Sequence, residues 1–255
     1  MTISERSLPY FDLNTPLAGL LYRDEAIDAG RPGILLIHGG AGLDDHARQQ
    51  AQRYASLGYV VLACDMFGPG ITRNRERVIE CLTVLRDDPA LLVRRAQAGL
   101  AALASRPDTD RRLAAIGFCF GGMAVLALAR AGVRLAGAVS IHGSLATSQP
   151  AVPGSVHARV LVCHGALDPH VPIDDVTAFA EEMNRADADW QLAMYGQALH
   201  GFTHQPRQSH QPRQSRQEPP PAATAGVGYD RRADHRSFAL TTSFLAEIFS
   251  DHVLR

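Results

Sequence analysis

Short apolar runs of strand length alternate along the chain with segments of helical spacing, and this alternation constrains the fold more than any other feature. The apolar runs occupy residues 17–22, 33–37, 59–64, 113–118, 135–141, 160–163 and 190–195. Helical spacing predicts helices at residues 47–55, 73–85, 88–103, 121–130, 176–183 and 237–249. Continuous apolar strands are typical of parallel sheets that are covered on both faces. We therefore expect one α/β domain over residues 1–255, with a mainly parallel central sheet between two layers of helices.

One segment interrupts this alternation. Residues 204–209 and 210–215 repeat the same six residues, His-Gln-Pro-Arg-Gln-Ser, and a proline-rich stretch follows. Between Gln205 and Ala225 no apolar side chain is larger than alanine or proline. Burial in such a stretch cannot offset the entropy lost on ordering. The sequence thus predicts a flexible loop inserted at about residues 204–225, and a lid over the functional site is a second interpretation.

Composition excludes several classes of function. The chain contains no lysine, so all 25 basic residues are arginines. Schiff-base chemistry, a GKS/GKT phosphate loop and a Ser-x-x-Lys acyl enzyme all need the lysine amine. Net charge is −1 and no arginine cluster stands out, which argues against a nucleic-acid partner. Neither a signal peptide nor a membrane span is evident, so we expect a cytoplasmic protein without a membrane partner.

A glycine-flanked cysteine stands where one strand gives way to a helix. Gly117-Phe-Cys119-Phe-Gly121 follows the run at 113–118 and opens the helix predicted at 121–130. This is the Gly-x-nucleophile-x-Gly turn, with cysteine in the position of serine. We predict Cys119 as the nucleophile and the Phe120 N–H as one oxyanion donor. A buried structural cysteine is the alternative, and it is our interpretation of the other three cysteines, which form no CxxC pair: Cys64, Cys81 and Cys163.

A thiol nucleophile needs a base, and the base needs an orienting acid. With a turn of this type the acid and then the histidine follow the nucleophile along the chain. Asp168 follows the run at 160–163, and His200 follows the run at 190–195. We predict these two as acid and base. Asp174 and Asp175 compete as the acid, but they resemble the first turn of the next helix.

Glycine-rich and aromatic residues at the other strand ends complete the predicted site. His38-Gly-Gly40 follows the run at 33–37, and we predict the Gly40 N–H as the second oxyanion donor. Other side chains expected to contact the substrate are His38, Phe67, His142, Phe202 and His204. A metal set of His164, Asp168 and His170 is conceivable, but the acid of a triad explains this loop more simply. We expect neither a metal nor a cofactor.

Taken together, these motifs resemble the dienelactone hydrolase family of α/β-hydrolases. The resemblance spans about residues 17–249, and it is carried by residues 117–122, 164–169, 200–202 and 226–230. It implies the α/β-hydrolase fold and a cofactor-free hydrolase of small esters or lactones. It also implies a Cys119–His200–Asp168 triad that works through an acyl-cysteine. A homodimer is one assembly open to such a protein.

Two positions depart from the type enzyme of the family. Gly39 aligns with a glutamate that helps to convert the cysteine to its thiolate, and His204 aligns with an arginine that holds a substrate carboxylate. Arg73, Arg75 or Arg77 could replace that arginine. Two alternatives stay open on the sequence alone. One is a thiol-redox or ligand-binding module on the same fold, and the other is hydrolysis of a different bond, such as a thioester or carbon–halogen bond.

Overall fold

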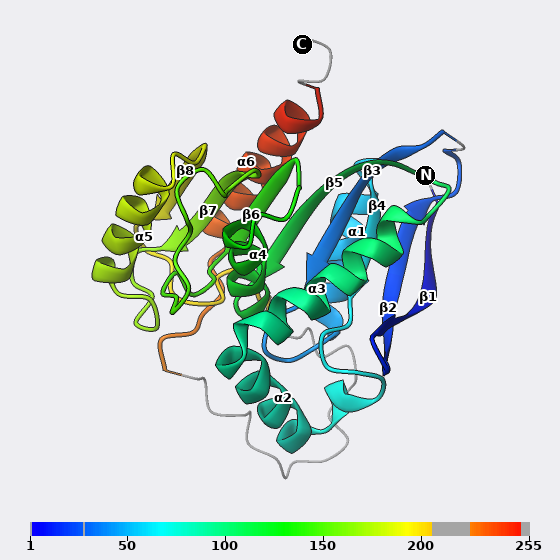
Figure 1. Ribbon diagram of the computed structural model, residues 1–255, viewed down its shortest axis with the longest axis horizontal. Helices are drawn as coiled ribbons and strands as arrows, with labels where there is room; N and C mark the ends of the chain where they lie inside the picture. The colour runs from blue at the N-terminus through cyan, green and yellow to red at the C-terminus, as the bar shows by residue number, and fades with distance from the viewer. Residues whose placement is uncertain (1, 28, 206–224, 251–255) are drawn as a thin grey trace.

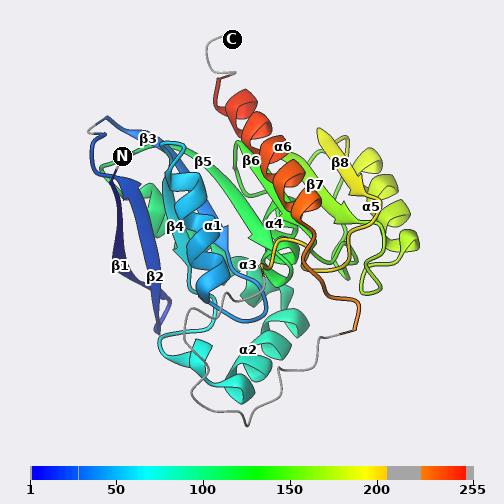
Figure 2. The ribbon, with the colours of Figure 1, turned by 180° about the vertical axis from the view of Figure 1, so that it is seen from behind.

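A single eight-stranded sheet runs through the molecule, with helices on both of its faces (Figures 1 and 2). The computed structural model describes residues 2–27, 29–205 and 225–250. The strands are β1 (Ile3–Asp12), β2 (Thr15–Asp24), β3 (Arg31–Ile37), β4 (Val60–Cys64), β5 (Thr109–Phe118), β6 (Gly137–Ile141), β7 (Arg159–Gly165) and β8 (Trp190–Tyr195). Their order in the sheet is β1-β2-β4-β3-β5-β6-β7-β8. Six neighbouring strands in this order are parallel to one another: β4, β3, β5, β6, β7 and β8. The β1–β2 hairpin joins them through β2, which pairs antiparallel with β4.

The helices form two apolar cores, one on each face of the sheet. They are α1 (Asp45–Ala55), α2 (Arg75–Asp87), α3 (Pro89–Ala104), α4 (Phe120–Arg130), α5 (Ile173–Arg185) and α6 (Arg231–Ser250), with a short 3-10 helix, η1 (Ile71–Arg73). On one face α1 and α6 share a core with the sheet, and on the other α3, α4 and α5 do (Figures 1 and 2). The expected mainly parallel sheet between two helical layers is therefore confirmed.

β1 was not predicted, because its side chains alternate between exposed and covered positions and form no continuous apolar run. Such alternation is typical of an antiparallel strand with one face toward the core and the other toward solvent. The inserted loop expected at about residues 204–225, with its second interpretation as a lid, lies outside the described residues apart from its ends.

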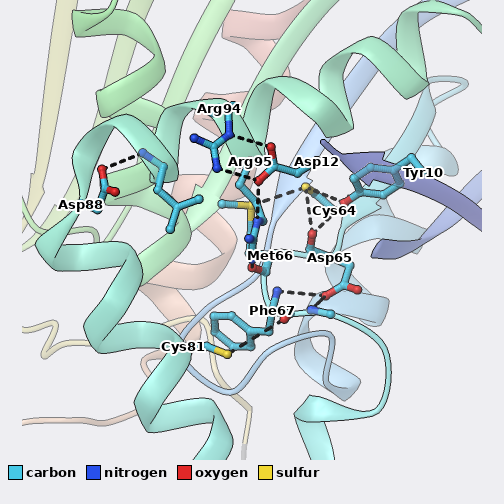
Figure 3. A network of polar contacts seen from close by, with 12 residues as sticks. Tyr10, Asp12, Cys64, Asp65, Met66, Phe67, Cys81, Asp88, Arg94 and Arg95 are labelled. Carbon is cyan, nitrogen blue, oxygen red and sulfur yellow. Dashed lines mark hydrogen bonds and ion pairs between the residues drawn. The ribbon is translucent and has the colours of Figure 1, made fainter. Parts of the chain in front are cut away.

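Polar contacts anchor the β1–β2 hairpin to the end of the sheet where the parallel strands finish (Figure 3). The buried carboxylate of Asp12 accepts hydrogen bonds from Arg94 Nε at 2.8 Å and from Arg95 Nε at 3.1 Å. Arg95 also donates to the Met66 carbonyl at 3.1 Å. The Tyr10 hydroxyl donates to the Asp65 carbonyl at 2.7 Å. These contacts fix the loop that follows β4, next to the predicted site.

A buried ion pair joins α4 to α5. Arg130 Nε and Nη2 each lie 2.8 Å from a carboxylate oxygen of Glu182, and the two side chains are 5% and 7% exposed. Arg130 also donates to the Leu145 carbonyl, and Glu182 accepts from the Ala151 N–H, both at 2.8 Å. The ion pair thus also holds the loop after β6.

Removing one partner of this pair should be costly, since the other charge would stay buried without compensation. We expect Arg130→Met to lower the free energy of unfolding in urea by about 3–5 kcal/mol. Arg185→Met is the matched control, because Arg185 and Glu181 form an ion pair on the surface at 66% and 65% exposure. That change should have an effect too small to resolve. Equal losses in the two variants would contradict the prediction.

Candidate active site

The turn between β5 and α4 holds Cys119 in a strained conformation, at φ +52° and ψ −113°. Two glycines make this turn sterically possible. A Cβ on Gly117 would lie 2.0 Å from the carbonyl oxygen of Gly121, and a Cβ on Gly121 would lie 2.1 Å from that of Ile37. Neither position can therefore carry a side chain without moving backbone. The turn leaves the sulfur half-buried at the carboxyl end of the sheet.

Three side chains from separate segments form a continuous hydrogen-bonded series at this turn. His200 Nε2 lies 3.1 Å from Cys119 Sγ, and His200 Nδ1 lies 2.7 Å from Asp168 Oδ2. Asp168 is buried in the loop after β7, and its other oxygen accepts from the His170 N–H at 2.8 Å. The structure thus brings together the three residues predicted as a triad. With Nδ1 held by the carboxylate, Nε2 faces the sulfur and can exchange a proton with it.

Electrostatics within this group favours a thiolate–imidazolium pair. Burial alone would raise the pKa of Cys119, but the hydrogen bond and charge of His200 lower it below the ordinary thiol value. Burial alone would lower the pKa of His200, but its hydrogen bonds to Asp168 and Cys119 raise that pKa to about 9. Burial also works against the ionised Asp168, and His200 again reverses the shift, so that the pKa of Asp168 is lowered.

The two predicted oxyanion donors also lie beside the sulfur. Hydrogen bonding from the backbones of Phe120 and Gly40 helps to lower the pKa of Cys119. Phe120 is the first residue of α4, where a backbone N–H has no partner within the helix. Both N–H groups can therefore stabilise negative charge that develops next to Cys119.

A cavity of about 470 Å³ opens at Cys119 and His200. This volume lies in the range of small-molecule sites. The lining residues are Arg86, Cys119, Phe120, Met123, Ser144, His170, Val171 and His200. His170, which the sequence suggested only as a conceivable metal ligand, lies two residues after Asp168, and Ser144, which no sequence pattern marked, lies two residues after His142.

The arginine of this cavity is not one of those that the sequence suggested. Arg86, near the end of α2, lines the cavity, and no sequence pattern marked it. Arg73 instead lines a separate, open depression of about 750 Å³ beside the loop after β3. Arg75 and Arg77 are exposed on the first turn of α2.

Four of the predicted substrate contacts are buried side chains that do not belong to the cavity lining. His38, Phe67, His142 and Phe202 are all buried, and none of them lines the cavity. His38 and His142 directly follow strands, and their rings pack back against the end of the sheet. His38 Nε2 accepts from the Met66 N–H at 3.3 Å, and His142 Nδ1 accepts from the Cys119 N–H at 3.2 Å. The prediction that these four side chains contact the substrate is therefore not supported. His38 and His142 instead bind backbone N–H groups near the nucleophile.

The fifth predicted contact, His204, lies beside Gly39. A Cβ on Gly39 would lie 3.7 Å from His204 Nε2 and 3.8 Å from Cys119 Cβ. The His204 ring stacks on that of His46, with 3.7 Å between the centroids. The two positions that depart from the type enzyme are thus neighbours next to the nucleophile, and His204 does not line the cavity.

The described part of the chain holds neither a metal-binding cluster nor a membrane-spanning helix. Within residues 2–27, 29–205 and 225–250, no group of three or more His, Cys, Asp or Glu side chains is placed to hold a metal ion. Across the same residues, no helix combines the length and apolar character needed to span a membrane.

Known proteins resemble this chain in sequence and in fold. A solved structure named dienelactone hydrolase-like promiscuous phosphotriesterase P91, from metagenomic libraries, is 34% identical, with a TM-score of 0.86 over 97% of this chain and 99% of its own. A Caenorhabditis elegans protein described as uncharacterized is 36% identical over 162 residues, which are 61% of this chain and 93% of that protein. A Yersinia pestis protein provisionally named a carboxymethylenebutenolidase is 26% identical over 189 residues, which are 70% of this chain and 71% of its own length.

A family model also matches the chain over most of its length. The model described as the dienelactone hydrolase family matches residues 17–249, nearly the whole chain. The match includes every element that contributes to the cavity and the hydrogen-bonded series. The protein therefore belongs to the dienelactone hydrolase family.

Proposed function

We propose that this protein hydrolyses small carboxylic esters or lactones through an acyl intermediate on Cys119. The observation that carries the proposal is the unbroken contact from Asp168 through His200 to the Cys119 sulfur, with distances of 2.7 and 3.1 Å. The cavity beside these residues supports it, because its volume of about 470 Å³ suits a small molecule. Family membership supports hydrolysis of an ester-type bond.

In the first half of the reaction the Cys119 thiolate attacks the carbonyl carbon of the substrate, while His200 holds the proton. The carbonyl oxygen becomes an oxyanion that accepts hydrogen bonds from the Gly40 and Phe120 N–H groups. Collapse of this intermediate breaks the bond to the leaving oxygen, which takes the proton from His200 Nε2. An alcohol leaves from an ester, whereas a lactone keeps its new hydroxyl on the acyl chain.

In the second half, water releases the acyl group. His200 Nε2 accepts a proton from the water as the oxygen attacks the thioester carbon. The same two N–H groups stabilise the second oxyanion, and the C–S bond breaks. Cys119 leaves as a thiolate, and the carboxylic acid departs. Throughout, Asp168 keeps His200 in the orientation that places Nε2 toward the sulfur.

Rapid-quench mass spectrometry with p-nitrophenyl acetate tests the intermediate. We expect a burst of nitrophenol and one acetyl group on the peptide that carries Cys119. The other three cysteines are the internal control, because burial raises the pKa of each: Cys64, Cys81 and Cys163. Steady turnover with acetyl on another residue, or on none, would contradict the proposal.

The pKa of Cys119 also predicts how its reactivity depends on pH. Only the thiolate reacts with iodoacetamide, so a lowered pKa moves the alkylation midpoint below about 8.5, the ordinary thiol value. In His200→Ala the effect of burial is no longer opposed by the imidazolium. The midpoint should then rise to the ordinary value or above it. Alkylation rates between pH 4 and 10 measure both midpoints, and an unchanged midpoint in the variant would refute the pairing with His200.

A further inference from the structure

Three buried side chains behind the nucleophile form a hydrogen-bonded chain that the proposed mechanism does not use. The Cys119 backbone N–H is shared between two acceptors, the Ile141 carbonyl at 3.0 Å and His142 Nδ1 at 3.2 Å. His142 Nε2 lies 2.8 Å from Thr203 Oγ1, which in turn lies 2.9 Å from His46 Nε2. None of these three side chains lines the cavity, and all three are buried. These hydrogen bonds connect the nucleophile turn, the end of β6, the segment after β8 and α1.

The chemistry of the groups fixes which atom donates and which accepts in the first two of these hydrogen bonds. A backbone N–H can only donate, so His142 Nδ1 accepts from Cys119 and carries no hydrogen. The neutral His142 ring then has its hydrogen on Nε2 and donates it to Thr203. Thr203 Oγ1 thus accepts from His142 and lies within hydrogen-bond distance of His46 Nε2 on its other side. Burial, reinforced by neighbouring positive charge, lowers the pKa of His142 well below its ordinary value and that of His46 to about 2, so both rings stay neutral.

This series of hydrogen bonds links the Cys119 turn to the turn that carries His200, and it does so through strained backbone. Cys119 and His142 have φ values of +52° and +42°, in a region that costs free energy for residues other than glycine. Such conformations persist only where the surroundings hold them in place. Thr203 lies three residues after His200, in the turn closed by the hydrogen bond from the His204 N–H to the Gly201 carbonyl. The contact between His142 and Thr203 therefore joins the nucleophile turn to the turn that carries the base.

We propose that His142 and Thr203 are positioning residues that set the contact between Cys119 Sγ and His200 Nε2. His46 holds the Thr203 hydroxyl from its other side. The inference rests on the pairing of Cys119 with His200 in the proposed function, but it does not depend on which bond the protein hydrolyses. It also gives a place to His142, which the sequence analysis had assigned to substrate contact.

Thr203→Val and Thr203→Ser test the link, because valine matches threonine in shape while serine keeps the hydroxyl. In Thr203→Val we expect kcat for p-nitrophenyl acetate to fall by about 10²-fold, since small displacements of catalytic groups have effects of that size. KM should change little, because the cavity wall is untouched. Iodoacetamide alkylation of Cys119 at neutral pH should slow, and its midpoint should rise. Thr203→Ser should restore most of both rates.

Thr241→Val is the matched control. Thr241 is a fully buried threonine on α6, outside the hydrogen-bonded chain. Its substitution should leave kcat and the alkylation midpoint unchanged. Wild-type values of both quantities in Thr203→Val would overturn the inference, as would failure of serine to restore them.

A second substitution tests whether the two residues act through one link. Asparagine tolerates positive φ and can accept from the Cys119 N–H, but in His142→Asn the side chain is too short to reach Thr203. The double variant with Thr203→Val should then be no slower than either single variant, because both changes break the same contact. Losses that multiply in the double variant would overturn the inference.

Spectroscopy of the unaltered protein covers the case in which variants fail to fold. Long-range ¹H–¹⁵N spectra distinguish the two neutral histidine tautomers, and we expect hydrogen on Nε2 of His142. Hydrogen on Nδ1 of His142 would exclude the hydrogen bond from the Cys119 N–H and would refute the proposed link. Spectra and alkylation use no ester. If the protein cleaves no ester yet both results hold, the proposed function fails and this inference stands.

Discussion

Cys119→Ala should lower kcat by at least about 10⁴-fold for every ester that the native protein cleaves. Alanine removes the nucleophile but leaves the Gly40 and Phe120 N–H groups and the cavity in place. Residual activity would therefore come only from binding and from oxyanion stabilisation. Initial rates with p-nitrophenyl acetate and a small lactone, under saturating substrate, measure the loss.

Two further variants make this result specific to the sulfur. Cys119→Ser should fall between alanine and the native protein, because a serine hydroxyl stays protonated and has to be activated by His200 at each turnover. Cys81→Ala is the control: Cys81 lies on α2, does not line the cavity, and has a raised pKa. It should leave kcat close to the native value. Activity of Cys119→Ala on any ester at a rate near that of Cys81→Ala would rule out the acyl-cysteine.

A large loss of stability is also expected for Gly121→Ala. Alanine normally favours a helix over glycine, and position 121 is the second residue of α4. Here, however, the added Cβ would lie 2.1 Å from the Ile37 carbonyl oxygen and 2.7 Å from that of His38. Both oxygens belong to backbone at the end of a central strand, so relief of the overlap has to displace α4 from the sheet. We expect the free energy of unfolding in urea to fall by at least about 3 kcal/mol.

Gly196→Ala provides the comparison for this prediction. A Cβ at Gly196 would have nothing within 4 Å, and this glycine has no positive φ. Its substitution should change the stability by less than about 0.5 kcal/mol. Near-native stability of Gly121→Ala would mean that the turn can open, and it would weaken the argument that the two glycines fix the nucleophile.

Much of the fold could be predicted because the central strands are covered on both faces. The buried length of such a strand is apolar, so β4 and the later parts of β3 and β5 are evident in the sequence, whereas the polar start of β5 at residues 109–112 is not. Helix starts were equally clear where a cap was present: Asp88 accepts from the Leu91 N–H, with Pro89 in the first turn of α3, as predicted. The edge strand β1 gave no such signal, since its side chains face solvent at many positions.

The predicted triad residues meet in space because each follows a strand of the same parallel sheet. The rest of the site could not be found in this way. Whether His142 faces the cavity or the space beneath Cys119 depends on how its ring packs, and residue type does not determine that. The role of Thr203 depends on which donors and acceptors face each other across three elements. Arg86 reaches the cavity from α2, a helix whose position depends on its packing against α3 and η1 and not on any local sequence pattern.

The position of α2 has a consequence for how this protein could be altered by design. α2 packs on α3 and η1, and Figure 1 shows it beyond the end of the sheet. The reacting groups are held by β5, β7, β8 and the segments that follow them, whereas Arg86 enters the cavity from this outlying helix. A saturation library at Arg86 would therefore remodel one wall of the cavity while leaving the chemical machinery intact. The fold thus separates the part that sets the reaction from a part that can be exchanged to select what reacts.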